Sequence, residues 1–306
     1  MRWASQDARP TRSRGEPLAG QPESARSPEL ALVGDRESKG LLGFALSPFE
    51  TVFRHRRLLF RTAAADMRAR YAGSVLGLAW MFVYPVLFLG IYSLVYIVVF
   101  KVRLQLYDSN EYVLMIFCGL IPFLGFTEGL GLGVPSISSN ASLIRNTLYP
   151  VEMVPTKAIV VSQCNQVVGL LLLLVATGFA GRLAPSALAL LAIWPLQICF
   201  TLGVVWVLAT LNIYFRDLQA SLSLITLLLL VASPIAYTEE MVGEGAVALL
   251  RLNPLYYFIV GYRAVLFEGR LPDVDILVAI VVLGLGSLWG GFWFVSQAKA
   301  VFSDNV

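Results

Sequence analysis

Charged residues, histidine and cysteine are all scarce in this chain of 306 residues. Only 14% of the residues are charged and 57% are hydrophobic, whereas a soluble globular domain is about 25% charged. The mean hydropathy of +0.72 agrees with this composition. Most of the chain is therefore expected to lie in lipid. The formal net charge of +3 is too small to indicate a nucleic-acid partner.

The scarcity of ligand-forming and nucleophilic residues excludes several kinds of site. The chain has one histidine, His55, and neither HExxH nor a pair of CxxC motifs, so no metal ligand is assigned. Its three cysteines, Cys118, Cys164 and Cys199, are scattered among apolar runs, which favours core packing over a disulfide framework. GxxxxGK[ST] and GxSxG are both missing, so the chain has no P-loop for a nucleotide and no catalytic residue is assigned.

The first 46 residues differ in composition from everything that follows. They are rich in Arg, Ser, Pro, Gly and Glu and poor in large apolar residues. Such a segment cannot bury enough apolar surface to fold, and it lacks the apolar core of a secretory signal peptide. We expect residues 1–46 to form a disordered cytoplasmic tail.

Six apolar segments are about 20 residues long, the length that a helix needs to cross a bilayer core of about 30 Å. The chain is therefore predicted to be an all-α membrane protein, with a transmembrane domain over residues 73–306. Its six transmembrane helices are predicted at Val75–Phe100, Tyr112–Val134, Val154–Ala180, Ala187–Leu211, Leu218–Tyr237 and Ile276–Ser296.

The segment Thr238–Asp273, between the last two predicted spans, is apolar only in short runs. Arg251, Pro254 and Arg263 are among the residues that interrupt it. Apolar runs of about 10–14 residues are typical of interfacial or re-entrant segments, whose backbone must be covered by protein or water. We expect a re-entrant helical gate here that lines a wet space.

Basic residues are concentrated just before the first predicted span, between Arg54 and Arg70. This concentration favours an orientation with both termini in the cytoplasm. Within residues 47–72, Phe49, Phe53 and Phe60 alternate with the arginines. The pattern predicts a basic amphipathic helix in the plane of the lipid headgroups. A positive-inside anchor with no further role is the alternative.

Two of the predicted spans contain polar side chains. Glu128 lies in the second span, and an intramembrane carboxylate is a functional candidate. The alternative is a group that sits at the headgroup boundary or pairs with a neighbour. The third span contains Ser162, Gln163, Asn165 and Gln166, which either join helices by hydrogen bonds or face an aqueous path.

The second predicted span contains three glycines that are spaced four residues apart. Gly125, Gly129 and Gly133 permit close helix packing, either inside one subunit or between two subunits.

The first span carries an aromatic residue at every fourth position. These residues form a stripe that winds slowly around the helix, at Trp80, Tyr84, Phe88, Tyr92 and Tyr96. Flat apolar rings with polar edges suit a surface over which sugars slide, and aromatic belts at the two membrane interfaces are the alternative. We assign Tyr84, Phe88 and Tyr92, and also Glu128 of the second span, to the lining of a channel.

Four stretches, taken in order, carry a family resemblance. They are DMRARYAGSVLGLAWMFVYPVLFLGIYSLVYIVVF (Asp66–Phe100), IPFLGFTEGLGLGVPSISSNASLIRNTLYPVEMVP (Ile121–Pro155), NIYFRDLQ (Asn212–Gln219), and SPIAYTEEMV with LNPLYYFIVGYRAVLFEG (Ser233–Val242, Leu252–Gly269). In this order they resemble the ABC-2 type permeases of polysaccharide and polyol phosphate export. That family includes exporters of O-antigen, capsule and teichoic acid. The resemblance covers nearly everything from residue 48 onward.

The resemblance implies a function in transport and a set of partners. The chain would be the transmembrane subunit of an ABC exporter that moves lipid-linked polysaccharide across the cytoplasmic (inner) membrane, as lipopolysaccharide biosynthesis requires. Two copies would pair with two copies of a separate ATPase subunit that binds ATP and Mg. The chain would then be a permease and not an enzyme, with no cofactor of its own. Its partners would be the ATPase, a second copy of itself, the lipid-linked glycan and membrane lipids.

The resemblance also implies roles for single residues. The loop Ser139–Val154 would dock on the ATPase, and a second contact would lie after span four, which gives the coupling residues Arg145, Tyr149, Pro150, Glu152, Arg216 and Asp217. The outer gate would contain Pro254, Tyr256, Tyr257 and Arg263. Glu128 departs from the family pattern, in which an apolar or aromatic residue is expected.

Two other functions stay open at this point. An ABC-2 exporter of small molecules would share the fold, with a weaker match in the gate and in NIYFRDL. A membrane enzyme of glycan assembly would need a cluster of histidines or carboxylates at membrane depth, and the sequence has no such cluster.

Overall fold

The computed structural model describes residues 41–95, 109–140, 150–239 and 244–305. The chain divides into two compact units, Met1–Leu46 and Ser47–Val306. Most of the tail that we expect to be disordered lies outside the described residues. Residues 41–46 of it form the start of helix α2 (Leu41–Arg54). Helices make up most of the described ranges, and these ranges contain no β-strand.

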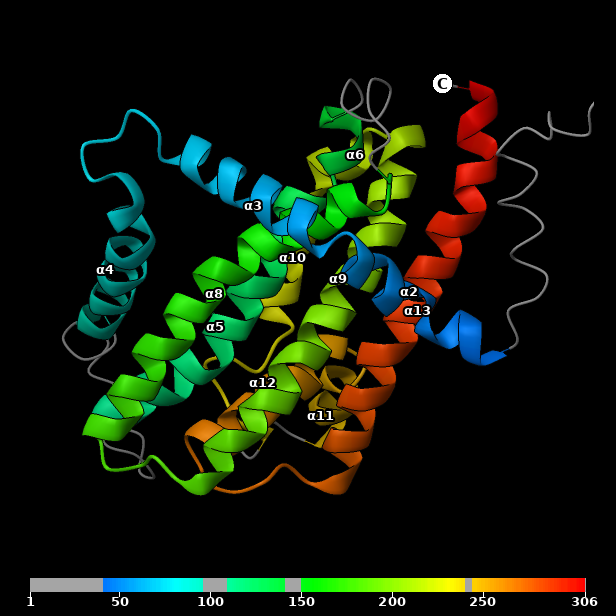
Figure 1. The fold of residues 1–306 in the computed structure, drawn as a ribbon. Coiled ribbons are helices and arrows are strands. Elements are labelled where there is room, and N and C mark those ends of the chain that lie inside the picture. The colour runs from blue at the N-terminus through cyan, green and yellow to red at the C-terminus, as the bar shows by residue number, and fades with distance from the viewer. Residues whose placement is uncertain (1–40, 96–108, 141–149, 240–243, 306) are drawn as a thin grey trace, which may run out of the picture. The chain divides into compact units, whose positions relative to one another are not determined.

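Within these described ranges, four helices are long and apolar enough to cross a membrane. They are α5 (Ser109–Gly133), α8 (Met153–Phe179), α9 (Leu190–Tyr214), which is preceded by the 3-10 turn η3 (Pro185–Ala189), and α13 (Val274–Asn305). They correspond to the second, third, fourth and sixth predicted spans. Figure 1 shows these long helices running alongside one another.

The first and fifth predicted spans correspond to shorter apolar helices. Helix α4 (Trp80–Leu94) follows the short 3-10 turn η1 (Gly77–Ala79), and the part of the predicted span after residue 95 lies outside the described residues. Helix α10 (Asp217–Val231) has 15 residues. At 1.5 Å per residue it extends about 22 Å, less than the bilayer core of about 30 Å.

Helix α10 ends six positions before the predicted Tyr237 because of the residues that follow it. Pro234 disfavours helical backbone at the preceding residue, Ser233. The residues from Ala232 to Tyr237 leave the helix and have backbone carbonyls that accept hydrogen bonds from other helices. The structure therefore corrects the end of this element to Val231.

Helix α5 packs against α8, α9 and α12 (Pro254–Leu266). Its glycine stripe is the contact surface. A Cβ atom at Gly125 would lie 1.9 Å from the side chain of Gln166, and one at Gly133 would lie 2.4 Å from that of Val205. The stripe is therefore covered by α8 and α9 inside the subunit, as the first of the two alternatives predicted.

Helices α9 and α13 cross with their backbones almost in contact. A Cβ atom at Gly203 would lie 2.0 Å from the carbonyl oxygen of Ser287, and one at Gly291 would lie 2.3 Å from the carbonyl oxygen of Gly203. Small residues are what allow two helices to approach so closely.

The polar residues of α8 join it to two neighbouring helices. Trp194 Nε1 donates to Gln163 Oε1 at 2.9 Å. Gln166 Nε2 donates to Gln197 Oε1 at 2.9 Å, and the Tyr262 hydroxyl donates to the same oxygen at 2.6 Å. Buried polar groups need such partners. This network fixes α8 to α9 and α12.

The basic segment before α4 forms two helices where the sequence predicts one. Helix α2 ends at Arg54, and α3 (Arg56–Arg70) begins after His55, whose backbone is not helical (φ −101°, ψ 12°). One face of α3, with Leu59, Ala63 and Met67, is buried against α8.

The other face of this segment combines apolar and basic side chains. Phe49, Phe53 and Phe60 are exposed, as are the arginines between them. The Arg56 guanidinium lies 3.9 Å from the centre of the Phe53 ring. The exposed face therefore has the composition of a helix that binds a membrane surface.

Candidate functional site

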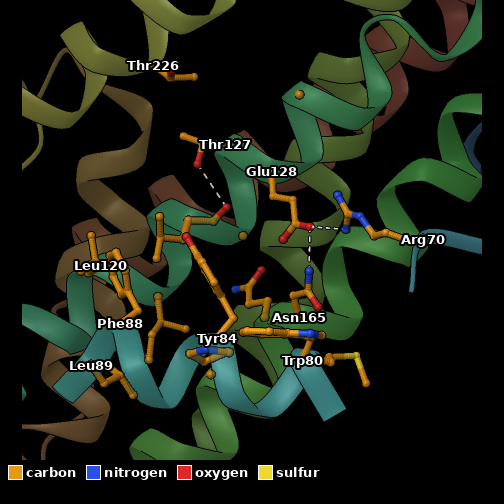
Figure 2. A pocket seen from close by; sticks show the side chains of 18 of the residues that line it. Arg70, Trp80, Tyr84, Phe88, Leu89, Leu120, Thr127, Glu128, Asn165 and Thr226 are labelled. Atoms are coloured by element: carbon orange, nitrogen blue, oxygen red, sulfur yellow. Dashed lines mark hydrogen bonds and ion pairs between the residues drawn. The ribbon is translucent and has the colours of Figure 1, made fainter. Parts of the chain in front are cut away.

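A cavity of about 1030 Å³ lies between α4, α5, α8 and α10. Figure 2 shows it from close by. Pockets for small ligands typically measure about 300–1,000 Å³, so this one is large enough for several sugar rings. The walls of the cavity differ in their side chains: one wall is aromatic, and the others carry polar groups.

Helix α4 supplies the aromatic wall. Trp80, Tyr84 and Phe88 line the cavity, and the Tyr84 and Phe88 rings are stacked, with centroids 6.1 Å apart and an interplanar angle of 19°. The predicted aromatic stripe therefore faces the cavity at three positions. The side chain of Tyr92 and all of Tyr96 lie outside what the structure describes.

The cavity contains one charged pair. Arg70 Nη1 donates to Glu128 Oε1 at 2.8 Å, and Asn165 Nδ2 donates to the same oxygen at 2.7 Å. The Glu128 side chain is 26% exposed. Of the described lining residues, only Arg70 and Glu128 carry a charge. Glu128 is therefore paired with neighbours, as the alternative interpretation predicted, and it also lines the cavity; a functional role for it stays a prediction.

Two polar residues of α8, Asn165 and Gln166, both join helices and line the cavity. Asn165 binds Glu128 of α5, and Gln166 binds Gln197 of α9. Hydrogen bonding between helices, the first of the two alternatives, is therefore seen for these residues, and an aqueous path beside them stays a prediction.

Helix α10 adds polar residues that the sequence analysis did not assign. Gln219, Ser223 and Thr226 line the cavity at spacings of four and three, which place them on one face of the helix. A polar stripe on an otherwise apolar helix was a signal available in the sequence. Arg70 was also missed, because its partner lies 58 residues away in the chain.

The residues proposed to contact an ATPase differ in exposure. Arg216 and Asp217 are exposed at the turn between α9 and α10, and Pro150 is half-buried. Arg145 and Tyr149 lie outside the described residues. Glu152 is only 6% exposed. Glu152 therefore packs inside this subunit at the start of α8, and its contact with an ATPase stays a prediction.

These segments lie at one end of the second unit. The Glu152 carbonyl accepts a hydrogen bond from Trp206 Nε1 of α9 at 2.9 Å. Further along α9, Asn212 Nδ2 donates at 3.4 Å to Ser138 Oγ of the short helix α6 (Ser136–Ser139). Helix α6, the start of α8 and the turn after α9 are therefore neighbours.

The described part of the segment predicted as a gate contains two short helices, α11 (Glu244–Leu250) and α12. Tyr256 is fully buried, and the hydroxyl of Tyr257 donates to the Arg251 carbonyl at 3.0 Å. Pro254 occupies the first turn of α12 after the cap residue Asn253, whose Oδ1 accepts from the Leu255 amide at 3.0 Å.

Arg263 binds the backbone that follows α10. It is 4% exposed, and its guanidinium donates to the carbonyls of Pro234, Ile235 and Tyr237, the last two at 3.3 and 3.2 Å. Asn253 Nδ2 adds a bond to the Ala232 carbonyl at 3.2 Å. Helix α12 is thereby tied to the end of α10, the helix whose earlier residues line the cavity.

Residues 57–267 match the family described as ABC-2 type transporter. The matched segment contains every described residue that lines the cavity, from Arg70 to Thr226.

Two proteins named "O-antigen export system permease protein RfbA" are similar to this chain. The protein from Myxococcus xanthus is 29% identical over 258 residues, which cover 83% of this chain and 97% of that protein. A protein from Klebsiella pneumoniae is 28% identical over 211 residues, which cover 67% of this chain and 78% of that protein.

Proposed function

The chain belongs to the ABC-2 type transporter family, and from this premise we propose that it is the transmembrane subunit of an ATP-driven exporter of lipid-linked polysaccharide. The cargo class follows from the two similar proteins, which are named as O-antigen export permeases. The observation that carries the proposal is the cavity between α4, α5, α8 and α10, where the aromatic wall faces polar side chains.

This lining suits a polymer of sugars. A sugar ring has apolar C–H faces and hydroxyl edges, so it fits between aromatic rings and hydrogen-bonding groups. A moving substrate must be held at several weak sites and not at one tight site. Trp80, Tyr84 and Phe88 on one side, with Ser223 and Thr226 on the other, provide such contacts. In this proposal the cavity is part of the export channel, and a second copy of the chain completes the channel wall.

The energy for export comes from a partner in this proposal. The sequence has no P-loop, so two separate ATPase subunits would bind ATP and Mg. They would dock where α6, the start of α8 and the turn with Arg216 and Asp217 meet. The segment with Arg145 and Tyr149 belongs to the same docking loop. Closure of the ATPase pair would move this end of the permease.

The proposed placement in the membrane is inferred from helices α2 and α3. Helices α2 and α3 expose phenylalanines and arginines that suit anionic headgroups. This favours the cytoplasmic face of the inner membrane for the docking end, with both termini in the cytoplasm. Helices α11 and α12 would then form a re-entrant gate toward the outer side.

Deletion of the gene in the native host tests this function. The proposal predicts that full-length surface polysaccharide accumulates inside the cell and that a plasmid copy restores the surface coat. An intact coat would contradict the proposed cargo and favour an exporter of small molecules. A strain that makes no polymer, even when another exporter is supplied, would favour an enzyme of glycan assembly.

A further inference from the structure

We propose that Glu128 and Asn165 form a binding subsite for one neutral sugar ring of the passing chain. In this subsite the ring stacks on the aromatic wall of α4 and donates hydroxyl hydrogen bonds to the Glu128 carboxylate. The inference rests on the proposed function, because it takes the cargo to be a glycan. It goes further by naming the residues that select the sugar.

The cluster has hydrogen-bonding capacity that the protein leaves unused. Both donors to Glu128, from Arg70 and Asn165, reach the same oxygen, Oε1. No described residue donates to Oε2, although a carboxylate accepts at about four lone-pair positions. Glu128 is 26% exposed and lines the cavity, and Asn165 holds its other oxygen in place. A hydroxyl of a ligand in the cavity would supply the donor that Oε2 lacks.

The charge of the cluster selects for a neutral ligand. Arg70 and Glu128 are the only charged groups among the described lining residues, and they lie 2.8 Å apart. Because the two charges are opposite and close together, their fields largely cancel at the position of a bound ligand. An ion of either sign would be attracted by one member of the pair and repelled by the other, so the pair would not compensate the ion for its lost hydration. Hydroxyl donors meet neither penalty.

The aromatic rings lie where a bound ring would stack. Figure 2 shows Trp80 and Tyr84 on α4, on the side of the cavity that Asn165 faces. A sugar that donates to Glu128 can therefore lay its apolar face on one of these rings. Carboxylate, amide and aromatic ring together discriminate by the positions of hydroxyls, because a sugar without the matching hydroxyl leaves buried acceptors unpaired.

A purely structural role for the ion pair makes a different prediction. If Arg70 and Glu128 only hold α3 against α5, exchanging them in the double variant Arg70→Glu/Glu128→Arg should preserve the protein's behaviour. In a sugar subsite the exchange removes the acceptor from the position beside Asn165 and places a guanidinium there. The exchange therefore separates the two roles.

The test measures sugar binding by the purified permease–ATPase complex in lipid nanodiscs. The probe is a set of oligosaccharide fragments from the host's own surface polysaccharide, titrated by calorimetry. We expect Glu128→Gln to weaken fragment binding by about tenfold or more, and the charge exchange to abolish it. Glu111→Gln is the matched control, because Glu111 pairs with Arg182 and does not line the cavity; it should bind as the wild type does. Each complex is first shown to be monodisperse.

Three outcomes overturn the subsite. They are wild-type binding by the exchanged pair, an equal loss in the Glu111→Gln control, and no binding of the fragments by the wild type. The gene deletion separates this failure from failure of the proposed function. If deletion removes the surface polysaccharide while Glu128 variants bind normally, only the subsite is wrong. If the coat persists after deletion, the cargo assignment itself is wrong.

Discussion

Lys157 Nζ of α8 lies 2.7 Å from Asp66 Oδ2 of α3, and this ion pair holds the basic helix α3 against the transmembrane bundle. The Lys157 side chain is only 9% exposed. The same contact surface buries Leu59, Ala63 and Met67. The orientation of α3 is therefore set by α8, and through Arg70 at its end α3 also reaches the cavity.

Removing the acidic partner should destabilise the protein. In Asp66→Asn, Lys157 keeps its charge in a buried position without a counter-charge, which costs on the order of 1–3 kcal/mol because Asp66 itself is half exposed. The measurement is thermal unfolding of the purified protein in detergent. Arg68→Gln is the control, because Arg68 is an exposed charge on the same helix. Equal melting temperatures for the two variants would show that the ion pair contributes nothing.

The crossing of α9 and α13 should tolerate no side chain at Gly203. The Cβ atom of Gly203→Ala would lie 2.0 Å from a backbone oxygen, so the helices must separate, at a cost of about 1–3 kcal/mol or more. We expect a large loss of folded protein in the membrane fraction. Gly286→Ala provides the comparison, since a Cβ there meets no atom within 4 Å. A Gly203→Ala variant as abundant as Gly286→Ala would contradict this packing.

The contacts of Arg263 predict a defect in export. Arg263→Ala would leave the carbonyls of Pro234, Ile235 and Tyr237 without this donor, at about 1–3 kcal/mol for each buried group that stays unpaired. The end of α10 would then come loose from α12. We expect surface polysaccharide to fall well below the level that Arg270→Ala supports. Arg270 is an exposed residue of the following turn, so its loss should have little effect.

A charge reversal at Arg216 should weaken the docking of the ATPase and thereby reduce export. Arg216 is exposed, so Arg216→Glu should leave the abundance of the protein unchanged while it weakens docking of the ATPase. The readouts are co-purification of the ATPase and surface polysaccharide. Arg270→Glu is the control at the opposite end of α9, because the adjacent Gly269 lies beside Ala184, just before the 3-10 turn that leads into α9. Normal co-purification and export in Arg216→Glu would remove this turn from the proposed docking surface.

The long spans could be predicted from the sequence because lipid imposes length and apolarity on them locally. The third span, predicted at Val154–Ala180, is α8 at Met153–Phe179. The fifth was predicted too long, since its end depends on Pro234 and on the distant Arg263. The break at His55 was missed because hydrophobic and basic residues continue without interruption through it.

The site could be predicted only in part. Periodicity identified Tyr84 and Phe88, and the cost of a carboxylate in a membrane identified Glu128. The pairing of Glu128 with Arg70 depends on how α3 folds onto α8, and no local pattern encodes that contact. The burial of Glu152 likewise comes from tertiary packing against α9.

In the proposed function, polysaccharide passes along the aromatic wall of α4. The most direct measurement places a photo-crosslinking amino acid at Tyr84 in living cells and tests the irradiated permease with an antibody to the polysaccharide. Phe82 is the matched position, exposed on α4 but not lining the cavity. We predict that polysaccharide is crosslinked to the permease at position 84 and that little is crosslinked at position 82. Absence of polysaccharide at 84, or equal labelling at both positions, would contradict it.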